Sequence, residues 1–337
     1  MLKSKQLAKA FLFTAALSAM ALPVQAQTQT GAFAYGADVS WVNQEEAGGY
    51  AFYNVNKVKT DPFVLLKNMN VNAVRLRVWV NPANGWCDGA DVLYKAKRAA
   101  AQGQRIMIDF HYSDVWADPA HQTLPAAWAK DTLAQLNTHV YGHTSGILSY
   151  LKTNGIDVTW VQVGNEINSG MLWPLGSTSN FGQLAQLINS GYNASKSVYP
   201  NAKVILHLAN GYNNANFQWF FDGVKGAGAN WDVIGMSHYP AAASWQTLDT
   251  ELAANMSKMV ARYNKPVIIS EVGMDYAQAS AAHSMLTDVI AKNKALGTYG
   301  LGVFYWEPEA YPGWQGYTMG ALNANGQFTA ALGAYAQ

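Results

Sequence analysis

The 337-residue sequence predicts an α/β fold, a single (β/α)8 TIM barrel, on three observations. Short β-branched or apolar runs alternate with longer segments that have helical periodicity, which is the pattern of βα units around a parallel sheet. The chain also has a length typical of one barrel of this kind, about 250 to 400 residues. Nearly every run ends in polar residues, as expected of a fold whose active site lies at the C-terminal ends of its strands.

The strand and helix candidates follow one another in the order that such a barrel requires. The predicted strands are Tyr35–Trp41, Ala73–Trp79, Arg105–His111, Val158–Gly164, Lys203–Leu208, Val233–His238, Pro266–Glu271 and Leu301–Trp306. The predicted helices include Asp61–Asn70, Asp91–Gln102, Leu133–Thr153, Phe181–Tyr199, Thr247–Tyr263 and Ala279–Ala295. Helical periodicity is clearest where apolar residues recur three or four positions apart, as at Leu184, Leu187 and Ile188. No internal repeat, low-complexity tract or linker marks a second module.

The first 26 residues have the composition of a removable signal peptide. Lys3, Lys5 and Lys9 precede an apolar run from residue 10 to residue 22, and Val24-Gln25-Ala26 has the small-x-small form of a cleavage site. The apolar run is shorter than the roughly 20 residues that span a bilayer. We therefore expect residues 1–26 to be a signal peptide and residues 27–337 to be the catalytic domain, exported to the periplasm or the medium. An uncleaved, membrane-anchored chain is the alternative.

Composition argues against several classes of partner. The chain has 22 Lys and Arg against 21 Asp and Glu, so it lacks the basic footprint of a protein that binds nucleic acid or an anionic membrane. A neutral or polar substrate fits this balance better. The 12 Trp and 18 Tyr include rings that can stack on sugar faces, although core packing accounts for most of them. Cys87 is the only cysteine, so no intrachain disulfide can form.

Polar residues close the predicted strands at the end where a barrel holds its active site. In chain order they are Asp38, Arg75, Arg77, Asp109, His111, Asn165, Glu166, His207, His238, Tyr239, Glu271, Trp306 and Glu307. Glu166 ends the fourth strand and Glu271 the seventh, so both carboxylates are predicted at the barrel mouth. Hydrolysis of a glycosidic bond needs two such groups, one to protonate the leaving oxygen and one to attack the anomeric carbon or activate water. A separation of about 5–5.5 Å would make the reaction retaining.

The residues around this carboxylate pair leave two readings open. Arg75 and Arg77 alternate onto the same strand face, where either can keep a nucleophilic carboxylate charged. In the other reading they are buried ion-pair partners with no part in catalysis. His207 is expected to be a satisfied core or rim histidine. The histidines have no paired ligand spacing and there is no glycine-rich phosphate loop, so we expect no metal ion and no cofactor.

The motifs around these residues run through nearly the whole chain after residue 26. They are Gly36–Trp41, Val74–Trp79, Asp109–Asp114 with its continuation through Trp128, Val163–Asn168 and Gly302–Pro308. Asn-Glu on strand four with Glu on strand seven resembles clan A of the glycoside hydrolases. The longer motifs, above all that of strand three, resemble family 53 within that clan, the endo-β-1,4-galactanases. The resemblance implies hydrolysis of internal β-1,4-galactosyl links in galactan and type I arabinogalactan, the neutral side chains of pectin.

The resemblance also implies a role for each site residue. Glu166 would be the acid/base and Glu271 the nucleophile, and Asn165 would donate a hydrogen bond to the sugar 2-hydroxyl. Trp306 would lie under the sugar ring and Tyr239 near the nucleophile. The full substrate-binding set that we predict is Asp38, Arg77, His111, Asp114, Trp116, Asn165, His238, Tyr239 and Trp306. Within this set, His111 would lie beside the reacting sugar, and Asp114 and Trp116 of the third loop would shape neighbouring subsites.

The chain departs from the family pattern in two regions. His238 stands where the family more often has a second tyrosine, and the Trp-His pair that usually follows is represented only by Trp245. The loop Val272–Ala282 is short and has Asp275 as its only carboxylate after Glu271, whereas bacterial members with a long loop here bind calcium. We therefore expect no calcium at this loop. The segment after Trp306 is also compact, which predicts a more open groove.

Two other functions remain open at this point. A mannanase or cellulase of the same clan would share the carboxylate pair, since substrate choice lies in the loops. A carbohydrate-binding barrel that has lost catalysis is the other alternative, although both carboxylates are present. For the enzyme we expect a monomer whose partners are β-1,4-galactan polysaccharide and galactooligosaccharides, with no nucleic acid and no membrane.

Overall fold

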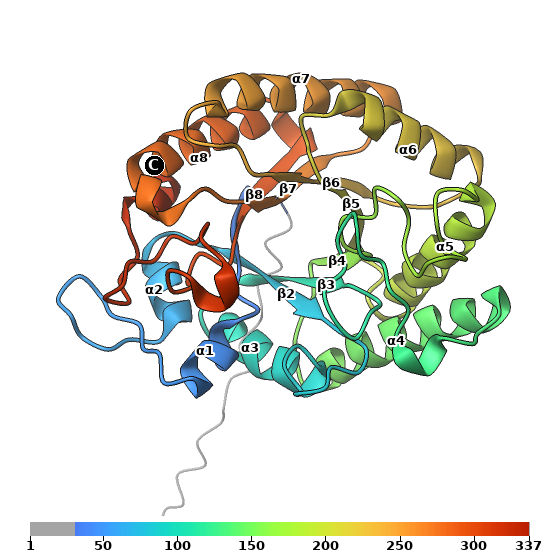
Figure 1. Ribbon diagram of the computed structural model, residues 1–337, viewed down its shortest axis with the longest axis horizontal. Coiled ribbons are helices and arrows are strands. Elements are labelled where there is room, and N and C mark those ends of the chain that lie inside the picture. The colour runs from blue at the N-terminus through green and yellow to red at the C-terminus, as the bar shows by residue number, and fades with distance from the viewer. Residues whose placement is uncertain (1–30, 337) are drawn as a thin grey trace, which may run out of the picture. The chain divides into compact units, whose positions relative to one another are not determined.

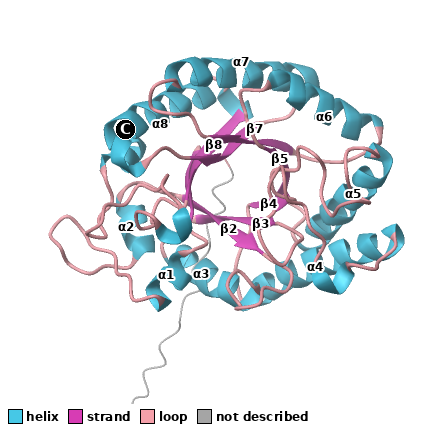
Figure 2. Ribbon diagram, in the orientation of Figure 1, coloured by secondary structure: helices cyan, strands magenta, loops and turns pink. Residues whose placement is uncertain are grey.

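Eight parallel strands close into a barrel in sequence order, β1 to β8, with the helices outside it (Figures 1 and 2). The structure is a computed structural model and describes residues 31–336. The strands are β1 Ala34–Asp38, β2 Ala73–Val78, β3 Arg105–Phe110, β4 Trp160–Val163, β5 Lys203–Leu208, β6 Val233–His238, β7 Val267–Val272 and β8 Gly300–Trp306. This confirms the predicted fold class and all eight strands. The predicted signal peptide, residues 1–26, lies outside the described residues.

The helices flank the strands as in a (β/α)8 barrel. They are α1 Val42–Ala47, α2 Pro62–Asn68, α3 Gly89–Ala101, α4 Leu133–Thr153, α5 Phe181–Val198, α6 Asn214–Gly226, α7 Trp245–Tyr263 and α8 Ala279–Lys294. The six predicted helices are all present, and α4 has the predicted bounds. Helices α1 and α6 were not among them, and α6 starts with an asparagine-rich segment of a kind common in loops. The Asn213 side chain accepts a hydrogen bond from the backbone of Asn216, however, and so caps this helix.

The barrel interior changes from apolar to polar along the strands. One residue from each strand forms an apolar layer near the N-terminal end: Ala34, Ala73, Met107, Trp160, Ile205, Val233, Ile268 and Phe304. The ring of Phe304 fills the space beside Gly36, where an added Cβ would come within 2.2 Å of it. Further along, the inward side chains include Arg75 and Asp109, two residues beyond this layer, and Asp38, four residues beyond it, because side chains on a strand alternate between its two faces. The strand pattern therefore places charged groups under the mouth of the barrel.

None of the helices within residues 31–336 is long and apolar enough to cross a membrane.

Candidate active site

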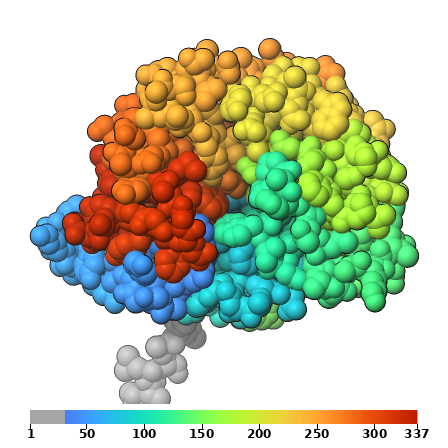
Figure 3. Space-filling model, in the orientation of Figure 1, coloured from blue at the N-terminus to red at the C-terminus, as the bar shows by residue number. Residues whose placement is uncertain are grey.

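A cavity of about 570 Å³ lies at the C-terminal ends of the strands. On the face in Figure 3 the surface is hollowed between the segment after β8, coloured red, and the green segments after β3 and β4. The cavity is lined by Trp41, His111, Trp116, Ala117, Asp118, Pro119, Asn165, Glu166, Ala209, Asn210, Tyr239, Glu271, Trp306, Gln315, Gly316 and Tyr317. Both predicted catalytic residues belong to this set. Of the predicted binding residues, His111, Trp116, Asn165, Tyr239 and Trp306 line it as well.

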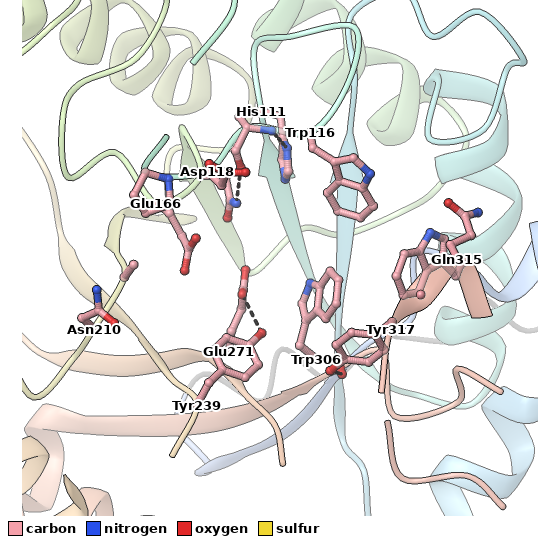
Figure 4. Close-up of a pocket in the computed structure, with 16 residues that line it drawn as sticks. His111, Trp116, Asp118, Glu166, Asn210, Tyr239, Glu271, Trp306, Gln315 and Tyr317 are labelled. Atoms are coloured by element: carbon pink, nitrogen blue, oxygen red, sulfur yellow. Dashed lines mark hydrogen bonds between the residues drawn. The ribbon is translucent and has the colours of Figure 1, made fainter. Parts of the chain in front are cut away.

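Glu166 enters the cavity from a strained turn that follows β4. Gly164 has φ +80° and Glu166 itself has φ +46°, a conformation that costs a non-glycine residue about 1–3 kcal/mol. An added Cβ at Gly164 would lie 2.5 Å from a methyl group of Ile167, so the turn requires glycine. The turn aims the Glu166 carboxyl into the cavity (Figure 4), where its Oε1 accepts a 2.6 Å hydrogen bond from the Ser237 hydroxyl.

Glu271 lies opposite, near the end of β7, and is held by two donors. The guanidinium of Arg75 is 2.9 Å from its Oε1, and the Tyr239 hydroxyl donates to its Oε2 over 2.8 Å. Figure 4 shows the two glutamates reaching into the same space, Glu166 from the turn after β4 and Glu271 from β7. Glu271 is thus ion-paired to a buried arginine, whereas Glu166 accepts a hydrogen bond from a neutral hydroxyl.

Arg75 is the central cation of the site. Besides Glu271, its guanidinium pairs with Asp38 at 2.7 Å and Asp109 at 2.8 Å, and it donates to Asn165 Oδ1 at 2.8 Å. It is 1 % exposed. Charge-assisted bonds of this kind fix the direction of a guanidinium and of the carboxylates around it. Of the two arginines that the sequence offered, Arg75 therefore holds Glu271, while Arg77 pairs with Glu307 at 3.1 Å.

Burial and charge give the two glutamates different properties. Burial, together with the charge of Glu271, raises the pKa of Glu166 to about 8 against the opposing Ser237 hydrogen bond. Burial also raises the pKa of Glu271, but Arg75 and Tyr239 lower it. When the pair shares one proton, the ionised form is best stabilised at Glu271, beside the cation. Near neutral pH, Glu166 therefore carries the proton and Glu271 the charge.

Asn165 and His111 line the cavity next to this pair with most of their polar atoms engaged. The Asn165 amide donates to the carbonyl of Ala117 at 2.8 Å, which leaves one amide hydrogen for a ligand. His111 Nδ1 accepts from the backbone N–H of Ala117 at 3.1 Å, so its Nε2 carries the proton and donates to Asp109 at 3.0 Å. Burial lowers the pKa of His111, so the ring is neutral. It presents a ring edge rather than an N–H group to the cavity.

Aromatic rings form the other wall of the cavity. Trp41, Trp116, Trp306 and Tyr317 contact one another edge to face, with centroid separations between 4.7 and 5.8 Å. Arg77 lies against this group, with its guanidinium carbon 4.0 Å from the Trp116 ring centroid. Mutual packing and a cation–π contact hold the rings in fixed orientations. Such a wall suits a flat, partly apolar ligand such as a sugar ring.

Four of the predicted binding residues do not line the cavity. Asp38 and Arg77 are buried beneath it, at 0 % and 1 % exposure, and orient other side chains. Asp114 accepts hydrogen bonds from the backbone N–H groups of residues 81 and 126 and so braces two loops. His238 points away from the barrel interior, because Ser237 occupies the inward position of β6, and its Nε2 is 2.6 Å from Asp249 of α7. His238, one of the positions that depart from the family pattern, therefore does not line the cavity.

Several cavity residues were not predicted. Trp41 closes the strand-one motif, and this position was the available signal for it. Asp118 and Asn210 come from loops after β3 and β5, and Gln315 and Tyr317 come from the segment after β8. Gln315 has φ +48° within a short turn and follows no periodic pattern, so nothing in the sequence marked it as part of the site.

Three buried carboxyls lie together behind the aromatic wall. Glu45, Glu307 and Glu309 are each 0 % exposed. Glu307 accepts from the backbone N–H of Trp41 at 3.0 Å and pairs with Arg77. Burial raises the pKa of Glu45 to about 8 and that of Glu307 to about 7, and burial with the charge of Glu307 raises the pKa of Glu309 well above its usual range.

This cluster predicts a fold that loses stability as pH rises. A carboxyl whose pKa is higher in the folded than in the unfolded state stabilises the fold fully below its unfolded pKa of about 4.5, and loses that contribution as pH rises through the folded pKa. The melting temperature should therefore fall between about pH 5 and pH 9. Glu309→Gln keeps the shape of a neutral carboxyl and should make this fall shallower, whereas Glu251→Gln, at an exposed position on α7, should not. If the melting temperatures of Glu309→Gln and of the parent protein fall equally between about pH 5 and pH 9, the assignment is wrong.

Comparison with known proteins places the chain in a family. The family model described as glycosyl hydrolase family 53 matches residues 34–335. The chain is 35 % identical to the probable arabinogalactan endo-β-1,4-galactanase A of Aspergillus terreus, over 83 % of this chain and 86 % of that protein. It is likewise 35 % identical to the arabinogalactan endo-β-1,4-galactanase of Thermothelomyces thermophilus, over 81 % and 88 %.

Solved structures agree with this placement. One of two fungal β-1,4-galactanases superposes with a TM-score of 0.84 at 30 % identity, covering 91 % of this chain and 100 % of that one. The GH53 catalytic domain of Ignisphaera aggregans superposes with a TM-score of 0.82 at 30 % identity, covering 90 % and 95 %. An intracellular xylanase of Thermoanaerobacterium saccharolyticum, at 15 % identity and a TM-score of 0.61, shares the fold. The chain belongs to glycosyl hydrolase family 53.

Proposed function

We propose that this chain is a retaining endo-β-1,4-galactanase in which Glu271 is the nucleophile and Glu166 the acid/base. The observation that carries the assignment is the unequal environment of the two carboxyls in one cavity. Glu271 is paired with Arg75, whereas Glu166 meets a neutral hydroxyl and has a pKa raised to about 8 by burial and by Glu271. The activity follows from membership of the family and from the galactanase names of relatives that cover most of the chain.

The proposed reaction is a double displacement. In the first step Glu271 Oε1 or Oε2 attacks the anomeric carbon, the bond from that carbon to the glycosidic oxygen breaks, and the proton of Glu166 passes to the departing oxygen. In the second step Glu166, now ionised, takes a proton from water as the water oxygen displaces Glu271. The bonds from Arg75 and Tyr239 keep Glu271 charged and aimed before the first step. Asn165, with its free amide hydrogen, is placed to bond the 2-hydroxyl of the reacting sugar.

The positions of the two glutamates define which side of the cavity receives each part of the polymer. The leaving group must lie on the side of the acid, where Asn210 and Asp118 line the cavity near Glu166 (Figure 4). The sugars that remain on the enzyme lie on the other side, against Trp306 and Trp116 (Figure 4). Stacking surface is thus concentrated on the non-reducing side of the scissile bond. We infer that most of the binding free energy comes from that side.

The test of this function is a comparison of polymers. Hydrolysis of potato galactan should exceed that of mannan and carboxymethylcellulose, with oligosaccharides released early as expected of internal cleavage. Trp116→Ala should raise KM on galactan about tenfold with a smaller change in kcat, because it removes a stacking surface remote from the reacting bond. Trp219→Ala, at an exposed tryptophan on α6, is the matched control. Mannan or carboxymethylcellulose as the preferred polymer, with galactan untouched, would overturn the proposal.

The activity is expected to disappear at alkaline pH. Glu166 acts first as an acid and must hold its proton, so kcat/KM should fall as pH rises through about 8, the value to which burial and Glu271 raise its pKa. A plot of kcat/KM against pH, over the range in which the protein stays folded, measures this limb. A profile that is flat to about pH 10 would show that Glu166 is not the acid.

We also propose that the chain works as a monomer outside the cytoplasm, in the periplasm or the medium. The basic, apolar and small-residue segments of its first 26 residues support export. Light scattering of the purified protein should give the mass of one chain, and cell fractionation should place the activity outside the cytoplasm with the N-terminus at residue 27. A dimer, or an intact N-terminus in the cytosol, would contradict these two proposals.

A further inference from the structure

The backbone turn that carries Glu166 is held on both sides of that residue. On the N-terminal side, the side-chain amide of Gln122 donates over 2.9 Å to the Asn165 carbonyl, which belongs to the peptide bond leading into Glu166. On the C-terminal side, the Ile167 N–H donates to the His207 carbonyl over 2.9 Å. Gln122 is 2 % exposed and is not among the residues that line the cavity. The left-handed conformation of Glu166, with φ +46°, thus lies between two fixed peptide groups.

The same amide group also binds the loop after β3. Gln122 Nε2 donates to the carbonyl of Asp118 over 2.9 Å, so its two amide hydrogens bond two carbonyl oxygens. Both partners are acceptors, so the side chain must present its NH2 group here. Asp118 lines the cavity near Glu166 (Figure 4), on the side that we propose for the leaving group. One side chain thus fixes the acid/base turn relative to the cavity wall beside it.

Gln122 is itself held by the loop after β4. Its backbone carbonyl accepts from the Trp173 N–H over 2.9 Å, and the next residue, Thr123, pairs with Trp173 in a parallel β-bridge. Nearby, the Ser169 hydroxyl donates to the Pro119 carbonyl over 2.7 Å. These contacts join the loops after β3 and β4, so the amide of Gln122 is directed at the turn from a fixed support.

The bond to the Asn165 carbonyl opposes the relaxation that the turn would otherwise undergo. A non-glycine residue with positive φ is strained, and rotation of the peptide group before Glu166 would bring its φ back to negative values. That rotation would turn the Asn165 carbonyl away from Gln122 and leave buried polar groups without partners. It would also move the Glu166 carboxyl, which must lie within hydrogen-bond reach of the glycosidic oxygen to transfer its proton.

We infer that Gln122 is a positioning residue that holds the acid/base turn in its strained conformation and so places the carboxyl of Glu166 against the leaving oxygen. The inference rests on the proposed function, in which Glu166 protonates that oxygen. The nucleophile Glu271 and the side chain of Asn165 have separate supports, in which Arg75 takes part. Loss of the Gln122 amide should therefore impair proton transfer by Glu166 and spare the attack of Glu271.

The test compares a substrate that needs the acid with one that does not. Gln122→Met keeps the length of the side chain and removes both donors. On galactan its kcat/KM should fall by about tenfold to a hundredfold, because a misplaced acid loses part of its contribution to the rate. On a galactobioside with a dinitrophenolate leaving group, kcat/KM, which reports the first step, should stay within about threefold of the parent value. Both assays use one enzyme preparation, so any unfolded fraction cancels in the ratio of the two values.

Gln104→Met is the matched control. Gln104 is 4 % exposed, and its amide donates to the Val71 carbonyl over 3.2 Å. It comes just before β3, at the end of the barrel opposite the cavity. The variant should lower the melting temperature and leave the ratio of the two kcat/KM values unchanged. If Gln122→Met loses activity on both substrates in the same proportion, or on neither, the inference is wrong.

Two further variants complete the test. Gln122→Asn keeps the amide on a side chain too short to reach both carbonyls, so it should change the ratio in the same direction by a smaller factor, and it serves if Gln122→Met does not fold. Glu166→Ala separates this inference from the proposed function. If Glu166→Ala also loses both substrates in the same proportion, Glu166 is not the acid and the proposed function fails. If Glu166→Ala spares the activated substrate and the Gln122 variants do not, only the role of Gln122 is wrong.

Discussion

Glu271→Gln is expected to lower kcat on galactan by roughly 10⁴- to 10⁶-fold, the range seen when a covalent nucleophile is removed. The amide has nearly the shape of the carboxylate, so Tyr239 retains a partner, but it neither attacks the anomeric carbon nor pairs with Arg75. Binding of galactooligosaccharides should persist, because the aromatic wall is untouched. Release of reducing ends measures the first effect, and calorimetric titration with galactotetraose measures the second.

Glu251→Gln is the matched control for this variant. It makes the same chemical change at an exposed position on α7, outside the cavity. Its kcat should equal that of the parent protein. If Glu271→Gln also hydrolyses galactan at the parent rate, Glu271 is not the nucleophile.

Glu166→Ala is expected to separate the two steps of the reaction. On galactan, kcat/KM should fall by about 10² to 10⁴, the contribution of a positioned acid. An aryl galactobioside with a dinitrophenolate leaving group needs no acid, so its first step should remain fast and the galactosyl-enzyme should accumulate. Azide, which needs no base, should then restore turnover and yield the β-galactosyl azide.

The outcome for Glu166→Ala depends on the environment of the residue. Glu166 has a pKa raised to about 8, so it is protonated and uncharged at the pH where Glu271 ionises. The alkaline limb of the pH profile on galactan, which reports loss of the Glu166 proton, should therefore disappear in Glu166→Ala, whereas the acidic limb, which reports ionisation of Glu271, should remain. If azide fails to restore turnover with the activated substrate, the role of Glu166 lies elsewhere.

The strands and the carboxylate pair could be predicted because local pattern determines both. A parallel barrel strand is a short apolar run, and the fold places whatever follows it at the mouth of the barrel. Lys203–Leu208 and Val233–His238 were therefore predicted to the residue. Glu166 and Glu271 needed only their positions at strand ends to be brought into one cavity.

Other parts of the site depend on contacts between distant segments. The alternation of β2 offered both Arg75 and Arg77 as partners for Glu271, and only the packing of β7 against β8 and β6 shows which one reaches it. His238 follows Ser237 in sequence, yet one residue of displacement along a strand sends it to the opposite face. Its neighbour Ser237, which the sequence gave no reason to choose, is the residue that meets Glu166.

The loops were the least predictable part. Gln315 and Tyr317 belong to a segment without periodicity, in which backbone angles of positive φ at residues 313, 315 and 316 set the direction of the chain. Such turns are fixed by the structure around them rather than by local preference. The edge-to-face contact of Tyr317 with Trp306, at 4.7 Å between centroids, is part of that surrounding structure.

Covalent trapping with an activated 2-deoxy-2-fluoro-β-galactobioside tests the central claim most directly. The fluorine slows both steps, and the good leaving group restores the first, so the glycosyl-enzyme should accumulate. Mass spectrometry of the digested protein should then find one added disaccharide on the peptide that contains Glu271, with the label fragmenting at that residue. A label on Glu166, or a protein that turns over without forming any adduct, would contradict the assignment of a retaining mechanism with Glu271 as its nucleophile.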